Sequence, residues 1–112
     1  MIYRLWGVGG AVVLSLLLGG AAAATDLAAG KKAARQCNVC HGKDGIAKNP
    51  EAPNLAGESA IYIEKQLMAF RRGERKHRQM TIVAKMLKDQ DIRALANWYA
   101  AMKVTVELPD VN

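Results

Sequence analysis

Apolar residues recur at helical spacing through the second half of the chain, and no segment alternates convincingly with the period of two typical of a strand. In residues 59–72, SAIYIEKQLMAFRR, the side chains of Ile63, Leu67 and Phe70 share one helical face, and Gly73 is a typical helix stop. This pattern predicts an amphipathic helix that packs on a core through that face.

Two further helical segments are predicted on either side of this one. Residues Asp26–Gln36 are rich in alanine, and Thr25 or Asp26 is of the type that caps a helix N-terminus. A second helical region, broken near Lys88, continues as Asp89–Met102, with an apolar stripe formed by Ile92, Leu95, Trp98, Tyr99 and Met102. The intervening loops are rich in glycine, proline and charge, so the sequence predicts an all-α domain.

Residues 1–24 have the layout of a secretory signal peptide. Arg4 supplies a positive charge, an apolar stretch follows, and small residues end in the cleavage signal Ala22-x-Ala24. We expect cleavage after Ala24, which leaves residues 25–112 as a single domain in the periplasm, where thiols oxidise unless they are occupied. The alternative is a retained anchor at the periplasmic face of the inner membrane, because the uncharged run Leu5–Ala24 has about the length of a spanning helix.

The two cysteines of the chain lie in residues 36–42, QCNVCHG, with His41 directly after Cys40. A thioredoxin-like redox pair would accompany a βαβ pattern, and a disulfide over so short a loop would constrain the unfolded chain little. A zinc site needs four ligands, and beyond Cys37, Cys40 and His41 the sequence offers His77 as a fourth. C-x-x-C-H is also the attachment motif of c-type haem, in which both thiols form thioethers and the histidine ligates the iron. Export and a small all-α domain favour one covalently bound haem.

An iron bound by His41 has a second axial position, for which Met80 is the favoured ligand. Met80 follows the polar loop GERKHRQ, where the chain has left one helix and has not yet entered the next, so its thioether can reach a metal without breaking helical hydrogen bonds. The alternatives are His77, which lies in a solvated basic run, or an open iron. The other methionines after the signal lie in helical patterns and are interpreted as packing residues: Met68, Met86 and Met102.

Five motifs between residues 26 and 102 form one set: CNVCHG, PNLAG, YIEKQLMAFRRGER, Met80 and LKDQDIRALANWYA. Together they resemble the class I c-type cytochromes, most closely the small bacterial monohaem branch, which is similar to each half of the periplasmic dihaem cytochromes. The resemblance implies the cytochrome c fold, with three to five helices wrapped around one covalently bound haem.

The resemblance also implies roles for individual residues. The side chains that it places on the haem are Cys37 and Cys40 as thioethers, His41 and Met80 as the proximal and distal iron ligands, and Tyr62 and Arg75 near the propionates. It implies that the carbonyl of Pro53 accepts the Nδ1–H of the proximal histidine, which would orient the ring. Gly30 would allow the last helix to cross the first closely, with Trp98 or Tyr99 over it.

The implied function is one-electron transfer without enzymatic catalysis, between respiratory or dehydrogenase donors and a terminal oxidase or reductase. The alternatives are a haem subunit or electron-entry domain of a larger oxidoreductase complex, and a haem-ligand-binding sensor. The chain has a formal net charge of +6, and the run RRGERKHR at residues 71–78 indicates either a solvated loop or a positive rim for redox proteins with an acidic docking surface. Nucleic acid is not expected as a partner, and membrane contact is expected only transiently or through a retained anchor.

Overall fold

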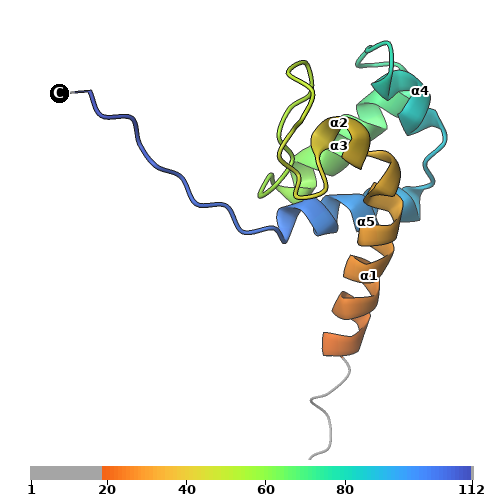
Figure 1. Ribbon diagram of the computed structural model, residues 1–112. Helices are drawn as coiled ribbons and strands as arrows, with labels where there is room; N and C mark the ends of the chain where they lie inside the picture. Colours follow the sequence, from red (N-terminus) through yellow and green to blue (C-terminus); the bar gives the residue numbers. More distant parts are fainter. Residues whose placement is uncertain (1–18, 112) are drawn as a thin grey trace, which may run out of the picture.

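The computed structural model describes residues 19–111. Within them the chain forms five α-helices and one 3-10 turn: α1 (Gly19–Ala33), η1 (Ala34–Gln36), α2 (Asn38–His41), α3 (Ala60–Arg72), α4 (Met80–Lys85) and α5 (Asp89–Ala100) (Figure 1). The helices α1 and α3 both pack against α5, and α4 packs against α3. The described residues contain no strand, so the all-α prediction is confirmed.

The crossing of α1 over α5 depends on Gly30. A Cβ atom at this position would overlap the backbone carbonyl of Ala94 and lie 2.6 Å from the Cβ of Trp98. Only a residue without a side chain therefore allows the two helices to approach this closely. The predicted role of Gly30 is confirmed, with Trp98 over it; the contact with Ala94 was not predicted.

The ends of α3 agree with the sequence prediction to within one residue. The hydroxyl of Ser59 accepts a hydrogen bond from the backbone N–H of Tyr62 at 3.1 Å, which caps the N-terminus. At the other end Gly73 has a φ of 73°, a left-handed conformation that glycine adopts without strain. The predicted inner face is confirmed because Ile63 and Phe70 are buried.

The first helix begins earlier than predicted. α1 runs through Thr25 and Asp26, so the predicted N-cap at these residues is wrong. The alanine-rich residues before them favour helix strongly, and the carboxylate of Asp26 accepts a hydrogen bond from the amide of Asn97 on α5 instead of capping. The predicted signal peptide and its alternative, a retained anchor, lie mostly outside the described residues. Within the described range no helix is both long and apolar enough to cross a membrane.

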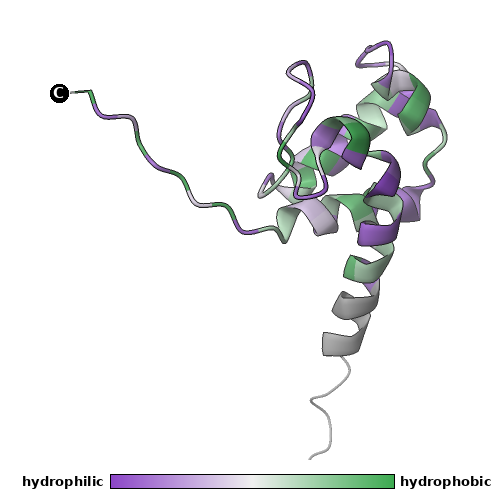
Figure 2. Ribbon diagram, viewed as in Figure 1, coloured by the Kyte–Doolittle hydropathy of each residue, from purple (hydrophilic) through white to green (hydrophobic). Residues whose placement is uncertain are grey.

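The core forms along the predicted stripe of α5. Ile92, Leu95 and Tyr99 are each at most 2% exposed, and the hydrophobic and hydrophilic residues alternate along this helix (Figure 2). Two of the methionines interpreted as packing residues do pack against this core, Met68 and Met102. The same interpretation is wrong for Met86, which is 65% exposed, because α4 ends at Lys85 and the chain turns toward α5 there.

The segment after Met102 extends away from the helical body (Figure 1). Residues 103–111 form neither helix nor strand, and their side chains are exposed. At the start of this tail, Val104 lies against Gly57, where an added Cβ would approach its Cγ2 to 3.0 Å. The first residues of the tail are therefore in contact with the body.

Candidate haem-binding site

Cys37, Cys40 and His41 are brought together by one helical turn. Cys37 closes η1 through its N–H, which donates to the carbonyl of Ala34 at 2.9 Å, and the N–H of His41 donates to the carbonyl of Cys37 at 2.9 Å. Residues three and four apart on a helical turn are neighbours on its surface. Both cysteine sulfurs are free, so the structure does not form the disulfide considered from the sequence.

The imidazole of His41 is buried and oriented. His41 as a whole is 6% exposed, and its Nδ1 lies 2.9 Å from the backbone carbonyl of Pro53. A carbonyl can only accept, so Nδ1 carries a proton, and in the neutral imidazole the lone pair is on Nε2. This is the contact that the resemblance implies, and it leaves one ring nitrogen available as a metal ligand.

The loop that carries Pro53 is fastened by its own hydrogen bonds. The side-chain oxygen of Asn54 accepts from the N–H of Ala47 at 2.8 Å, and the N–H of Leu55 donates to the carbonyl of Gly45 at 2.7 Å. Gly45 has a φ of 73°, and a Cβ there would lie 2.8 Å from the backbone nitrogen of residue 56. These contacts hold the Pro53 carbonyl against His41; the part played by Asn54 and Gly45 was not predicted.

Met80 is the first residue of α4 and not part of the preceding loop, which corrects the prediction that the helix begins after it. It is half-buried, and its N–H donates to Nδ1 of His77 at 3.2 Å. His77, the rival ligand, is exposed, and its Nδ1 also accepts a hydrogen bond from the backbone N–H of Gln79. Figure 1 shows α4 on the same side of α5 as α2, which carries His41.

The zinc interpretation finds no support in the arrangement of the side chains. Among the described residues, no three or more histidine, cysteine, aspartate or glutamate side chains form a group that could hold a metal ion. His77 therefore does not complete a zinc site with the motif residues.

Beneath the cysteine turn lies a polar contact that the sequence did not reveal. The side chain of Tyr99 is 2% exposed, and within the described residues its hydroxyl has no hydrogen-bond partner. The hydroxyl lies beside the sulfur of Cys37: burial raises the pKa of that thiol, and the hydroxyl partly offsets the effect. Burial, and then the nearby Cys37, raise the pKa of Tyr99.

These features fit a covalently attached haem. The turn offers two free sulfurs to the vinyl groups and a buried imidazole with one free nitrogen to the iron. A buried hydroxyl without a partner also indicates a site that its present neighbours do not complete.

Tyr62 lies on α3, and the side chain of Arg75, from the loop after this helix, folds back onto it. Tyr62 is 48% exposed, and Gln66 follows one turn later on the same face. The side-chain oxygen of Gln66 accepts a hydrogen bond from Arg75 at 2.8 Å, and the guanidinium of Arg75 stacks on the ring of Phe70 at 4.6 Å. The two side chains predicted near the propionates therefore share one surface.

The family model described as Cytochrome c matches residues 27–103. The chain belongs to the cytochrome c family. This confirms the resemblance and the fold that it implies, and members of this family carry covalently bound haem c.

The relatives of this cytochrome include proteins of one and of two domain lengths. Cytochrome c4 of Pseudomonas aeruginosa is 39% identical over 106 residues, which cover 90% of this chain and 53% of the relative. Cytochrome c-554(548) of Halomonas halodenitrificans is 41% identical over 83 residues, 71% of this chain and all of the relative. A protein of Stutzerimonas stutzeri named thiosulfate dehydrogenase electron acceptor is 37% identical over 68 residues, covering 58% of this chain and 32% of the relative.

The solved structures include reduced recombinant cytochrome c4 from Pseudomonas stutzeri, with a TM-score of 0.66 and 30% identity. The match covers 71% of this chain and 50% of that one. This chain thus spans about half the length of the cytochromes c4 that it matches.

Two arginines of the predicted positive rim at residues 71–78 form ion pairs with carboxylates. Arg71 donates to the carbonyl of Leu87 at 3.0 Å and pairs with Asp89 at 2.6 Å, which holds the pKa of that carboxyl below its usual range. Arg72 pairs with Glu74 at 2.9 Å. Arg71 thus links α3 to the start of α5. Because their charges are partly neutralised, Arg71 and Arg72 contribute less to the attraction of an acidic partner than the sequence alone indicates.

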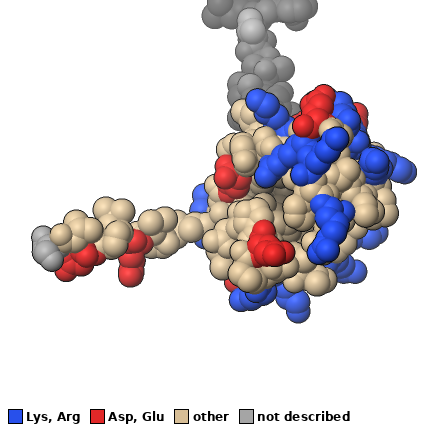
Figure 3. Space-filling view, turned by 90° about the horizontal axis from the view of Figure 1, so that it is seen from above, with Lys and Arg blue, Asp and Glu red and all other residues tan. Residues whose placement is uncertain are grey.

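Two of the remaining cations of this segment, Lys76 and Arg78, line an open groove of about 560 Å³, here called the distal groove. It is formed by Gly73, Lys76, His77, Arg78, Thr81, Ile82 and Lys85. No acidic residue lines it among those described, and Ile82 is 64% exposed. Figure 3 shows lysine and arginine side chains around the rim of the helical body and acidic side chains along the extended tail. The distal groove therefore combines positive charge with an apolar contact, directly beside Met80 in the sequence.

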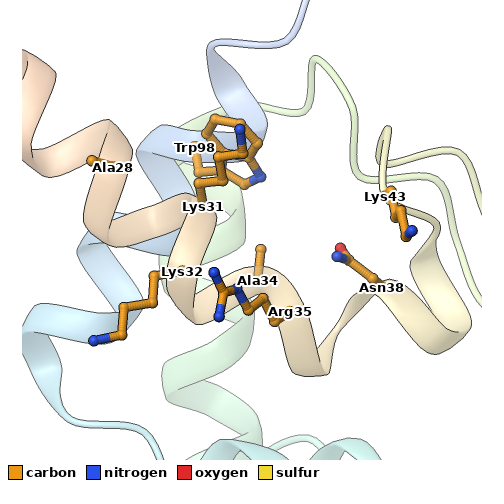
Figure 4. Close-up of a pocket in the computed structure, with 8 residues that line it drawn as sticks. All are labelled: Ala28, Lys31, Lys32, Ala34, Arg35, Asn38, Lys43 and Trp98. Carbon is orange, nitrogen blue, oxygen red and sulfur yellow. The ribbon is translucent and has the colours of Figure 1, made fainter.

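A second basic hollow lies beside α1. It measures about 360 Å³ and is lined by Ala28, Lys31, Lys32, Ala34, Arg35, Asn38, Lys43 and Trp98 (Figure 4). None of the lining residues is a cysteine, histidine or methionine. This α1 hollow is therefore not the haem site, although Asn38 adjoins Cys37 in the chain.

Proposed function

We propose that the chain is a one-electron carrier in which a single haem c is attached through Cys37 and Cys40 and ligated by His41 and Met80. The observation that carries this proposal is the buried His41 ring, oriented by the Pro53 carbonyl at 2.9 Å within the turn that also presents both sulfurs. When bound, the haem iron accepts and releases one electron. The relatives bear the names of cytochromes and of an electron acceptor, which supports a carrier and not an enzyme.

The residues of the chain perform three tasks in this proposal. The Pro53 carbonyl holds the proton on Nδ1 of His41, so that Nε2 is the ligand nitrogen in both oxidation states. The thioether of Met80 supplies a soft ligand that favours ferrous iron and so raises the reduction potential. Tyr62 on α3 and Arg75, which lies against this helix, offer a hydroxyl and a cation, which suits two carboxylates of a propionate edge.

Residues 25–112 form one periplasmic domain with one haem in this proposal, after cleavage of residues 1–24. The chain has a single C-x-x-C-H motif, which supports one haem. Cytochrome c-554(548), matched over 83 residues and its full length, supports a protein of one domain. The net charge of the chain is far enough from zero to favour a soluble protein that diffuses freely in the periplasm. Attachment at the inner-membrane face is the alternative.

The proposal is tested by intact mass spectrometry of the exported protein, together with oxidised and reduced absorption spectra. We expect a mass equal to residues 25–112 plus one haem, and a ferric charge-transfer band in the red that reports iron–methionine ligation. A colourless protein without added mass contradicts the proposal, whereas an uncleaved mass with one haem contradicts only the cleavage.

The distal groove is the surface that we propose for docking of acidic redox partners. Lys76, Arg78 and Lys85 take part in no ion pair among the described residues, and Ile82 can exclude water at the centre of a contact. Opposite charges accelerate encounter, with an effect that salt screens.

Replacing Lys76→Glu and Arg78→Glu together is expected to lower the rate at which the ferrous protein reduces anionic hexacyanoferrate(III) by about tenfold at low salt. The effect should shrink as the ionic strength rises above about 0.1 M, where the screening length falls to about 10 Å. Stopped-flow absorbance measures both rates. The matched control, Lys31→Glu with Lys32→Glu in the α1 hollow, makes the same change in net charge; an equal loss in the control would contradict docking at the distal groove.

A further inference from the structure

The hydroxyl of Tyr99 is not explained by packing. The ring is among the largest fully buried side chains and fills the core between α5 and the cysteine turn. A phenylalanine would fill the same volume, yet the chain buries an oxygen that has no hydrogen-bond partner among the described residues. Buried polar groups in folded proteins are almost always paired, so this oxygen needs a partner that the folded chain alone does not give it.

The polar group beside this hydroxyl is the sulfur of Cys37. Cys37 packs against the core cluster that contains Tyr99, and the two side chains interact electrostatically. A free thiol is a poor partner because its S–H is a weak donor and its sulfur a weak acceptor. The hydroxyl accordingly lacks a full hydrogen bond among the described residues, although its interaction with the sulfur has hydrogen-bond character.

We propose that the Tyr99 hydroxyl donates a hydrogen bond to the sulfur of Cys37 once that sulfur is a thioether, which makes Tyr99 a positioning residue of the haem attachment. This inference rests on the proposed function. Addition of the thiol across a vinyl double bond forms a carbon–sulfur bond and leaves the thiol hydrogen on the other vinyl carbon, so no oxidant or reductant is consumed. The sulfur then has no hydrogen and can only accept, and the phenol beside it can donate.

This hydrogen bond has a consequence for electron transfer. A donor on the thioether would draw electron density away from the sulfur and, by induction through the saturated carbon between them, from the macrocycle, which favours the ferrous state. In this hydrogen bond the positive end of the O–H dipole would lie toward the sulfur, and so toward the group attached to it. Both effects raise the reduction potential, although the hydroxyl does not touch the iron.

The test is the variant Tyr99→Phe, compared with the unaltered holoprotein and with the control Ile92→Val. Ile92 is a buried residue of the same helix, and its variant also removes one heavy atom from the core without touching a cysteine. We expect Tyr99→Phe to keep its covalent haem and to have a lower reduction potential, while Ile92→Val keeps the unaltered potential. An unchanged potential in Tyr99→Phe, with haem attached, overturns the inference.

A second measurement uses the unaltered holoprotein and does not depend on a variant that folds. The Tyr99 hydroxyl proton is expected to exchange slowly with water and to show a nuclear Overhauser effect to the β-protons of Cys37. A rapidly exchanging hydroxyl without this contact overturns the inference as well. Failure of the proposed function looks different, because no form of the protein would then carry covalent haem.

Discussion

A chain with Cys37→Ala and Cys40→Ala is expected to lose all covalently bound haem and most of its stable tertiary structure. The two sulfurs are the only thiols of the chain, so no other residue can form the thioethers. Ten apolar residues are buried among those described, and four of them are alanines: Ala34, Ala84, Ala94 and Ala96. So small a core gives a chain of this length little stability without a bound group.

Intact mass and near-ultraviolet circular dichroism measure the two losses. The control is Val39→Ala, which changes the same turn between the cysteines but replaces a side chain that is 80% exposed. We expect the control to keep its haem and its aromatic dichroism. A double variant that still carries a covalently added haem would contradict the attachment site, and a well-folded double variant without haem would contradict the structural role of the group.

The helices that carry an apolar stripe were predictable because the spacing of apolar residues within each helix defines the face that packs on the core. Ile63 and Phe70 on α3 and Leu95 and Tyr99 on α5 are buried as the helical spacing predicts. The start of α1 was not predictable in the same way, because a run of alanines continues a helix without marking its end. Met86 shares the spacing of core residues, but the chain turns at the end of α4 and carries the side chain out to solvent.

In the site, too, contacts between residues close in the sequence were predictable, and contacts between distant residues were not. The C-x-x-C-H turn is local, so its residue types alone indicated its chemistry. Arg71 looked like a surface charge, and only the fold brings it to Asp89, 18 residues further along the chain. The contact of Tyr99 with Cys37 likewise joins the last helix to the first turn, and no spacing in the sequence marks it.

Replacing Met80→Ala is expected to open the iron to external ligands and to lower its reduction potential. Met80 begins α4, so removal of its side chain leaves the helix and its hydrogen bond to His77 in place. Loss of the thioether removes a soft ligand that favours ferrous iron, and we expect a fall on the order of 0.1 V, within the range of about 0.8 V that axial ligands span. Redox titration measures the potential, and the reduced spectrum under carbon monoxide measures ligand binding.

Two variants separate Met80 from its competitors. Met86→Ala removes the same side chain from an exposed position just past the end of α4, and His77→Ala removes the rival ligand. We expect both to keep the red charge-transfer band and to exclude carbon monoxide. Binding of carbon monoxide by the unaltered protein would contradict methionine ligation and favour a haem-ligand sensor. Absence of the band from the unaltered protein, with carbon monoxide bound by His77→Ala but not by Met80→Ala, would transfer the distal position to the histidine. Carbon monoxide binding by the unaltered protein would make the iron a site for small external ligands. The expected result keeps both axial positions of the iron occupied by side chains and restricts the protein to the transfer of electrons.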